Sequence, residues 1–381
     1  MYLHSLETEG FRNLQPNKLN LDCVPVVIWG ENGQGKSNLL DAAVLGCTGA
    51  LWRTTKDEEG ISWDKEITRV KIGVCGSDEE EINTEVVLAR TGKGLLKING
   101  VARRRSDLLG LIPLVGFSSE DIQIIRGEPS RRRRFLNTEL SRLDRSYHWN
   151  LVHFGRSLEQ RNRLLKEIRE GKGSPTALSP WNESLARYGA KLIEKRARFL
   201  QELAAVSANH LNRLNPGWGS LRLDYQPALG GFNTEEIPEK TVQELQDLLA
   251  KGLRQSQGEE VARGFSLVGP HRDDFRLLVG EVHQRTYGSQ GEQRCLAIAL
   301  RLGLVEIVKK AAGESPILIL DDIFSELDQS RRRGLLDVLG FEGQFLLTTP
   351  EREEIPAGLL EKAQLVQIHK GKIISAGNNQ G

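Results

Sequence analysis

The sequence predicts an α/β protein in which a mixed sheet with an antiparallel layer is interrupted by an inserted helical hairpin. Three observations support this fold class. Short β-branched runs occur near both ends of the chain, a glycine-rich turn follows the first run, and apolar residues in the middle repeat at three- and four-residue steps. At about 150 residues per domain, the 381 residues correspond to two or three structural units.

The first buried strand is predicted at Val24–Trp29, a β-branched run typical of a parallel sheet. Residues 67–101 contain short alternating segments separated by turn signals, of which Asn99–Gly100 is a hairpin signal, so we expect an antiparallel layer there. Towards the C-terminus, the apolar pattern predicts strands at 275–279, 317–320 and 345–347 and a helix at 290–312.

The middle of the chain has helical periodicity. It runs over 136–168 and again over 181–206, with a Gly/Pro-rich turn at 171–175 between them. Two such helices form an antiparallel hairpin, each about 40 to 60 Å long. Either the hairpin projects as an arm or it belongs to an ordinary helical domain, and the sequence favours the arm. The predicted domains are a head formed by 1–125 and 264–381 and an arm formed by 126–263.

Charge divides along the chain. The net charge is +1, but residues 126–214 contain 19 Lys and Arg against 9 Asp and Glu, a net +10, and the rest contains 33 against 42, a net −9. Fifteen of those 19 cations are Arg, whose planar fork of donors suits phosphate. Nucleic acid is therefore a candidate partner.

Composition excludes several classes of protein. Apolar residues make up 39% and charged residues 27%, and no apolar stretch approaches the roughly 18 residues of a membrane span. Residues 1–7 do not resemble a secretory signal, so we expect a cytoplasmic protein with no membrane partner. No C-x-x-C spacing occurs, which argues against zinc and disulfides and predicts reduced core residues at Cys23, Cys47, Cys75 and Cys295.

A phosphate-binding loop follows the first buried strand. Residues 30–37 fit G-x-x-x-x-G-K-[ST], the Walker A motif, between a strand and a helix. Glycines let backbone N–H groups surround the β-phosphate, Lys36 neutralises the β- and γ-phosphates, and Ser37 offers a hydroxyl to Mg²⁺. ATP and Mg²⁺ are the expected cofactors, and the expected nucleotide contacts are Gly30, Glu31, Asn32, Gly33, Gln34, Gly35, Lys36, Ser37 and Asn38.

A second magnesium-binding group is predicted at the end of a later strand. The apolar run 317–320 ends in Asp321 and Asp322, which is a Walker B pattern. Asp321 is expected to complete the magnesium shell with Ser37, and Asp322 is the candidate catalytic residue that orients the attacking water.

Two further motifs predict an ABC-type P-loop ATPase head. Residues 287–294 resemble the S-x-G-x-Q signature, which in such ATPases caps a helix aimed at the γ-phosphate bound by a second copy. Residues 325–328 resemble the D-loop, with Asp328 as its acid. Taken alone the signature could be a plain helix cap, but its place between Walker A and Walker B favours the trans role, carried by Ser289, Gln290, Gly291, Glu292 and Gln293.

Within this class the chain resembles the RecF family, bacterial recombination-repair ATPases related to SMC proteins. The resemblance is carried by four segments that span nearly the whole chain: 10–14, 120–136, 269–274, and 320–328 with Arg331 and Leu335 beyond it.

Some positions depart from the family pattern. Ser119, Glu128 and Asn137 stand where the family usually has proline, a small residue or Asp, and Asp, respectively. The strand at 345–347 ends in Thr348-Thr349-Pro350, without the switch histidine of many ABC ATPases. The identity of the γ-phosphate sensor is left open.

The resemblance implies a function in recombinational repair, replication restart and the SOS response to DNA damage. It implies an ATP-dependent homodimer on duplex DNA near single-strand gaps that works with RecO and RecR type mediators to load recombinase. It also implies a slow, DNA-dependent ATPase whose hydrolysis opens the dimer. ATP would lie between Lys36 of one subunit and Ser289 of the other, and Arg12 would join the nucleotide contacts.

Two arginine clusters are candidates for DNA contact. Cations near a helix N-terminus oppose its dipole, so the cluster at the start of the insertion favours phosphate or partner binding over a merely solvated helix face. A similar cluster lies beside the Asn99–Gly100 turn. The candidates are Arg131, Arg132, Arg133 and Arg134, and Arg103, Arg104 and Arg105.

The main alternative is an SMC-like structural DNA clamp with negligible ATP turnover. Asp322 in place of the usual Glu favours it slightly, but the insertion is far too short for an SMC coiled coil. A transporter subunit would have no reason to carry a basic arm.

Overall fold

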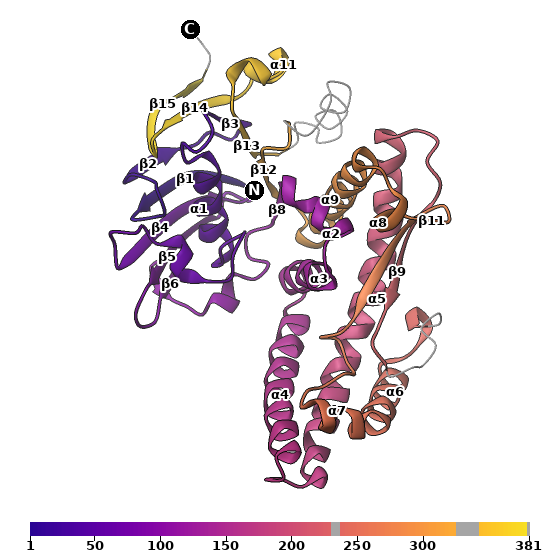
Figure 1. Ribbon diagram of the computed structural model, residues 1–381. Helices are drawn as coiled ribbons and strands as arrows, with labels where there is room; N and C mark the ends of the chain where they lie inside the picture. The colour runs from indigo at the N-terminus through magenta and orange to yellow at the C-terminus, as the bar shows by residue number, and fades with distance from the viewer. Residues whose placement is uncertain (230–236, 325–342, 379–381) are drawn as a thin grey trace. The chain divides into compact units, whose positions relative to one another are not determined.

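The computed structural model describes residues 1–229, 237–324 and 343–378 (Figure 1). Its contacts divide the chain into two compact units. The first comprises Met1–Asp121 and Arg301–Gly381, and the second comprises Ile122–Leu300. Residues 264–300, which we assigned to the head from sequence, lie in the second unit; the predicted boundaries at 126 and 263 stay a prediction.

The first unit contains an antiparallel sheet in the order β2-β1-β4-β5-β6-β7. Its strands alternate buried and exposed residues, as β4 does from Ile67 onwards, because one face packs on the core. The antiparallel layer predicted at 67–101 is thus confirmed. The strands are β1 (Tyr2–Glu9), β2 (Asn17–Asn20), β4 (Ile67–Cys75), β5 (Glu81–Ala89), β6 (Leu95–Ile98) and β7 (Val101–Ala102).

The second sheet is mixed and has the strand order β15-β14-β3-β13-β12-β8. The Walker A loop follows its strand β3, and the Walker B residue Asp321 ends its strand β12. Strands β14, β3, β13, β12 and β8 are parallel neighbours, and β15 pairs antiparallel with β14. Every residue of β12 and β13 is buried, in keeping with their apolar sequences. The strands are β3 (Val26–Trp29), β8 (Leu114–Ser118), β12 (Ile317–Asp321), β13 (Phe345–Thr349), β14 (Gln364–His369) and β15 (Lys372–Asn378).

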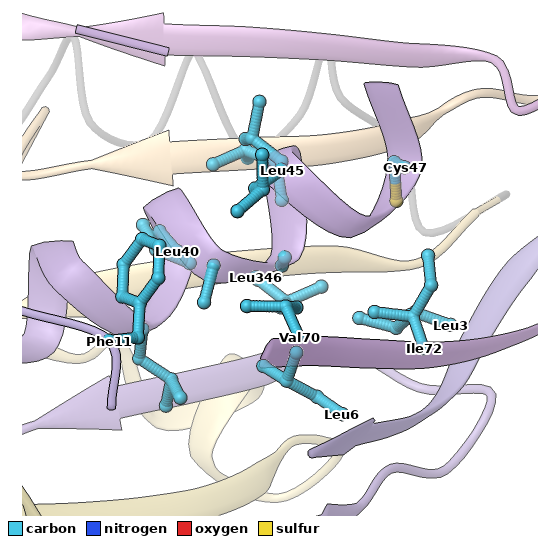
Figure 2. Packing of buried hydrophobic residues seen from close by; sticks show 14 of the residues in the cluster. Leu3, Leu6, Phe11, Leu40, Leu45, Cys47, Val70, Ile72 and Leu346 are labelled. Atoms are coloured by element: carbon cyan, nitrogen blue, oxygen red, sulfur yellow. The ribbon is translucent and has the colours of Figure 1, made fainter. Parts of the chain in front are cut away.

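Helix α1 (Lys36–Thr48) is held in a core built from both sheets (Figure 2). Leu40 and Leu45 of the helix pack with Val70 of the antiparallel sheet and Leu346 of the mixed sheet, and all four are fully or almost fully buried. Burial on this scale fixes the position of the helix, and with it the loop at its N-terminus. The shorter helices of this unit are η1 (Asp57–Gly60), η2 (Arg105–Leu108), η3 (Ser119–Ile122), η6 (Arg352–Glu354) and α11 (Ala357–Leu360).

The second unit is built on the predicted hairpin, now α4 (Arg145–Arg169) and α5 (Ser179–Leu214), which lie side by side (Figure 1). A three-stranded sheet, β11-β10-β9, belongs to the same unit. Its other elements are α2 (Gln123–Arg126), α3 (Pro129–Leu143), η4 (Pro175–Leu178), β9 (Leu221–Gln226), η5 (Ile237–Glu239), α6 (Val242–Gln255), α7 (Gln257–Arg263), β10 (Asp274–Val279), β11 (Val282–His283), α8 (Gln284–Tyr287) and the start of α9 (Gln290–Ala312).

The prediction of one continuous helix over 136–168 was wrong. Asp144 adopts an extended conformation between α3 and α4, and its side chain accepts hydrogen bonds from the backbone N–H groups of Ser146 and Tyr147. A carboxylate at this position caps the second helix. The apolar spacing continues across the break, which is why periodicity alone did not reveal it.

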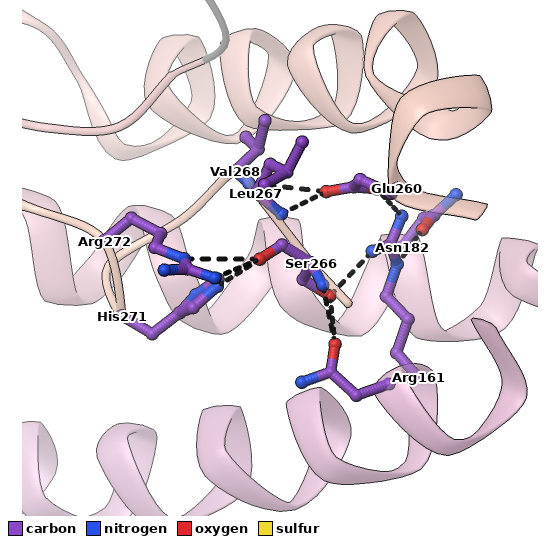
Figure 3. A network of polar contacts seen from close by, with 9 residues as sticks. Arg161, Asn182, Glu260, Ser266, Leu267, Val268, His271 and Arg272 are labelled. Atoms are coloured by element: carbon purple, nitrogen blue, oxygen red, sulfur yellow. Dashed lines mark hydrogen bonds and ion pairs between the residues drawn. The ribbon is translucent and has the colours of Figure 1, made fainter. Parts of the chain in front are cut away.

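Three buried arginines tie the segment 260–274 to the helices of the second unit. Arg161 pairs with Glu260 at 2.6 Å, Arg196 with Asp273 at 2.8 Å, and Arg132 with Asp274 at 2.6 Å. Figure 3 shows the first of these networks, in which the Arg161 guanidinium also donates to Ser266 Oγ. Any other course of residues 260–274 would leave buried charges unpaired. The three ion pairs therefore favour the observed course of this segment along the helices.

The structure bears on two predictions from composition, the burial of the cysteines and the absence of a membrane-spanning segment. Cys47 and Cys295 are buried and Cys75 is half-buried, but Cys23 is exposed, so the prediction of four core cysteines was wrong for that residue. Within the described ranges no helix is long and apolar enough to cross a membrane.

Candidate nucleotide-binding site

The Walker A loop joins β3 to α1, as predicted. Gly30, Gly33 and Gly35 have φ values of 148°, 78° and 112°, which side-chain-bearing residues rarely adopt. A Cβ on Gly30 would also lie 2.4 Å from the carbonyl oxygen of Ile368 in β14. The backbone conformation therefore favours glycine at all three positions, and the close approach of β14 also requires it at Gly30.

Two side chains and a turn hold the loop in place. The Gln34 side-chain oxygen accepts from the N–H of Lys370 at 2.6 Å, and its backbone carbonyl accepts from Gly371 N–H at 2.8 Å. The Asn38 amide donates to Asn13 Oδ1 at 2.8 Å. Of the remaining predicted contacts, Glu31, Asn32 and Gly33 are exposed on the loop.

Lys36 is almost fully buried at the start of α1. Its ammonium donates to the carbonyl oxygens of Gly30 at 2.5 Å and Glu31 at 2.9 Å. Burial lowers the pKa of Lys36, and the nearby carboxylate of Asp322 opposes that shift. The ammonium group is thus held inside the loop by two of the loop's own carbonyl groups.

Ser37 and Asp321 meet directly. Ser37 Oγ donates to Asp321 Oδ1 at 2.8 Å, although the residues lie 284 positions apart. The hydroxyl of Thr348, at the end of β13, donates to the same carboxylate oxygen at 2.8 Å and accepts from the N–H of Asp322 at 2.9 Å. Thr348 therefore links the carboxylate of Asp321 to the backbone N–H of Asp322, at the strand end where the switch histidine is missing.

Asp322 has a left-handed backbone, with φ at 51°. Non-glycine residues adopt this conformation rarely, and Asp tolerates it better than most. The hydrogen bond from its N–H to Thr348 helps to hold the turn that follows β12.

Two arginines form ion pairs with buried carboxylates at this site. Arg53, in the loop after α1, forms an ion pair with Asp321 Oδ2, and Arg12 pairs with Asp41 Oδ2 at 2.5 Å. Arg12 also donates to Asn38 Oδ1 at 2.8 Å, so it acts on the phosphate loop through α1. Asp41 is fully buried, and burial raises its pKa, opposed by Arg12 and Arg53.

The residues present fit a magnesium ion. Mg²⁺ prefers hard oxygen ligands and commonly takes one or two from protein together with phosphate oxygens. Ser37 Oγ and Asp321 Oδ1 form such a pair, already within hydrogen-bond distance of each other. Arg53 is partly exposed, so its side chain could leave the carboxylate as a metal ion enters.

The signature residues lie in the second unit. Ser289 and Glu292 form a capping box at the start of α9: Ser289 N–H donates to Glu292 Oε2 at 2.7 Å, and Glu292 N–H donates to Ser289 Oγ at 3.3 Å. Ser289 and Gln290 are exposed, Gly291 is half-buried, and the buried Gln293 side chain donates to the carbonyl of Gln284 at 2.6 Å. The role of these residues towards a second subunit stays a prediction, and Asp328 lies outside the described residues.

The arginine candidates divide by exposure. Arg103 and Arg104 are exposed, and Arg105 pairs with Asp57 at 2.6 Å. In α3, Arg131 is exposed and Arg134 is half-buried. Arg132 is buried against Asp274, and Arg133 donates to the Asp273 carbonyl at 2.9 Å. DNA contact stays a prediction for all seven, but Arg132 has a structural role of its own.

Comparisons with known proteins agree with this architecture. A family model described as RecF/RecN/SMC N terminal domain matches residues 2–373. The DNA replication and repair protein RecF of Halothermothrix orenii is 37% identical over 358 residues, which cover 92% of this chain and 92% of that protein. The chain belongs to the RecF family. A second RecF, from Synechococcus sp., is 35% identical and covers 98% of this chain and 97% of that one.

Solved structures support the same assignment. A structure described as the recombination mediator protein RecF-ATP in the RecFOR pathway has a TM-score of 0.88 and 32% identity, covering 98% of this chain and 97% of that chain. An Smc head bound to the C-winged helix domain of ScpA, at 16% identity and a TM-score of 0.57, shares the fold. The predicted ABC-type ATPase fold and the resemblance to RecF are both confirmed.

Sequence reasoning missed Arg53 and Thr348 as parts of the RecF-type site. Neither belongs to a motif, and each reaches Asp321 only through the fold. Thr348 had one usable signal, its position at the end of the predicted strand 345–347, where many ABC ATPases have the switch histidine.

Proposed function

We propose that this RecF-family chain is an ATP-dependent, dimerising DNA-binding protein of recombinational repair and replication restart. It binds duplex DNA near single-strand gaps and helps RecO and RecR type mediators load recombinase. Hydrolysis is slow, depends on DNA and opens the dimer, so nucleotide sets the residence time on DNA. The relatives named as DNA replication and repair proteins support this role.

The contact between Ser37 and Asp321 carries the nucleotide part of the proposal. It joins Walker A to Walker B at the carboxyl edge of the mixed sheet, beside the buried ammonium of Lys36. A bound Mg²⁺ would neutralise charge on the β- and γ-phosphates. Lys36 would exchange its carbonyl partners for phosphate oxygens, and Ser37 and Asp321 would hold the metal.

Asp322 is the proposed catalytic residue. Its carboxylate follows the metal-binding Asp321, and the N–H bond to Thr348 fixes its backbone. From that position it would orient the water that attacks the γ-phosphate. Ser289 of the partner subunit would complete the site, because the exposed N-terminus of α9 offers N–H groups and a positive dipole end.

An SMC-like clamp with negligible turnover is the second candidate. Asp322 favours it, since its carboxylate has one methylene less than the usual Glu and reaches a shorter distance. Both candidates share ATP-dependent dimerisation and differ in hydrolysis.

Measuring ATP turnover with and without duplex DNA tests the proposal. The repair ATPase predicts slow turnover that duplex DNA stimulates and that Asp322→Asn abolishes, with Glu351→Gln, an exposed acid after β13, as the control. Turnover that is negligible under both conditions would favour the clamp. Turnover that is fast and unaffected by DNA would contradict both.

A further inference from the structure

An exposed indole stands on the hairpin of the second unit, outside every motif described above. Trp149 in α4 is 51% exposed, although a tryptophan side chain is costly to leave in water. His153, one helical turn further along, lies against it with ring centroids 4.0 Å apart, and Tyr188 of α5 meets it edge-on at 5.5 Å. The rings of His153 and Tyr188 thus pack against the indole of Trp149 and restrict its movement.

Three cations lie within one helical turn of these rings along α4 and α5, and none of them pairs with a described carboxylate. Arg187 lies over the Tyr188 ring at 4.6 Å and donates to the Tyr188 hydroxyl at 2.7 Å, so it is held in place. Arg156 and Lys191 are exposed and form no ion pair with any residue that the structure describes. The two facing segments, 145–156 and 184–191, contain four Lys and Arg and no Asp or Glu.

The nearest carboxylates outside these segments are mostly engaged. Asp144 pairs with Lys195 at 3.0 Å, and Glu194 pairs with Arg198 at 2.6 Å. The surface is therefore a fixed aromatic platform beside the cations Arg156, Arg187 and Lys191, with Glu159 and Glu183 just beyond it in the sequence.

From this combination we propose that Trp149 stacks on an unpaired base of single-stranded DNA while Arg156, Arg187 and Lys191 contact its phosphates. Proteins bind single strands through this pairing of aromatic faces with a cationic track. An acidic peptide would match the charge, but it would gain little from a protruding, braced ring. The inference rests on the proposed DNA binding and assigns the single-stranded side of a gap to this surface.

The test measures binding of full-length protein, with ATP and Mg²⁺, to three fluorescently labelled DNAs. One is an intact duplex, one a duplex with a ten-thymidine gap, and one the same gap made of abasic residues. Trp149→Ala should weaken binding to the thymidine gap about ten-fold and leave the intact duplex unchanged. Trp149→Phe should retain most of the affinity, and Trp63→Ala, which removes an indole that is 98% exposed in the first unit, should have no effect.

Several results would overturn the inference. Wild-type protein that bound the thymidine and abasic gaps equally would exclude base stacking. A Trp149→Ala variant that bound the thymidine gap normally, yet lost binding to a poly-glutamate peptide, would make a protein the occupant. Wild-type protein that bound none of the three DNAs would contradict the proposed function as well, whereas normal duplex binding with no effect of Trp149 would contradict only this inference.

Discussion

Ser37 Oγ donates a hydrogen bond to Asp321 Oδ1 at 2.8 Å, and Thr348 Oγ1 donates to the same oxygen at the same distance. Two hydroxyls, one from the phosphate loop and one from the end of β13, thus converge on one buried carboxylate. One of them belongs to the phosphate loop and is a candidate metal ligand. The other also accepts a hydrogen bond from the backbone N–H of Asp322, and so connects Asp321, the proposed metal ligand, to Asp322, the proposed catalytic residue.

Thr348→Val should therefore impair hydrolysis more than nucleotide binding. Valine keeps the volume but leaves the Asp322 N–H without its acceptor, at a cost of about 1 to 3 kcal/mol. If half of that cost falls on the transition state, kcat drops by about two-fold to about ten-fold. Steady-state turnover and ATP titration of the same variant separate the two effects, and unchanged kcat would show that the Thr348 link has no catalytic importance.

Arg53→Ala tests whether the ion pair to Asp321 competes with magnesium. The pair is partly exposed, and such pairs contribute about 1 kcal/mol or less. Removing Arg53 should lower the Mg²⁺ concentration needed for half-maximal ATP binding by up to about five-fold. A higher requirement for ATP at saturating Mg²⁺ would instead show that Arg53 contacts the nucleotide. Arg69→Ala, which removes an exposed cation of β4, is the matched control.

The α3 arginines should separate into two classes. Arg131 is exposed, so Arg131→Ala should leave stability unchanged and reduce the salt dependence of duplex binding by about 0.9 in log-log slope. Arg132 is buried against Asp274, so Arg132→Ala should destabilise the protein by about 3 kcal/mol. Salt titrations and urea unfolding measure the two quantities. An unchanged slope in Arg131→Ala would assign that residue to solvent or to a protein partner.

His271 should make the second unit sensitive to acid. Burial lowers the pKa of His271; Nε2 contacts the carbonyl of Ser266 at 3.1 Å, and the buried Nδ1 has no hydrogen-bond partner among the described residues. The folded ring stays neutral where the unfolded ring takes up a proton, so stability is lost as pH falls through about 6.5. Urea unfolding of wild type and His271→Gln at pH 7.5 and 5.5 should show a smaller pH-dependent loss in the variant. Equal losses would contradict the assignment.

The sequence predicted the parts of the protein whose chemistry is local. Glycine spacing identified the loop before Lys36, and the apolar run 317–320 identified β12, because both patterns are imposed by neighbouring residues. Contacts between distant segments were predictable only where two motifs share a ligand, as for Ser37 and Asp321. Counting charges placed Arg132 among the DNA contacts and gave no sign of its partner, Asp274, which lies 142 positions away. The ion pair between Arg53 and Asp321 was not predicted for the same reason.

In the proposed dimer, Lys36 of one subunit and Ser289 of the other complete a single ATP site. Molecular mass in solution, measured by light scattering with ATP and Mg²⁺, tests it most directly. Wild type should double its mass. Lys36→Ala should stay monomeric because it fails to bind ATP, and Ser289→Arg should bind ATP but stay monomeric because a bulky cation replaces a capping hydroxyl.

A mixture of the two variants decides between a composite site and two independent defects. The Ser289→Arg subunit has an intact phosphate loop and the Lys36→Ala subunit has an intact signature, so one complete site can form per heterodimer. We predict ATP-dependent heterodimers in the mixture and none in either variant alone. A Ser289→Arg protein that doubled its mass with ATP as wild type does would contradict the composite site.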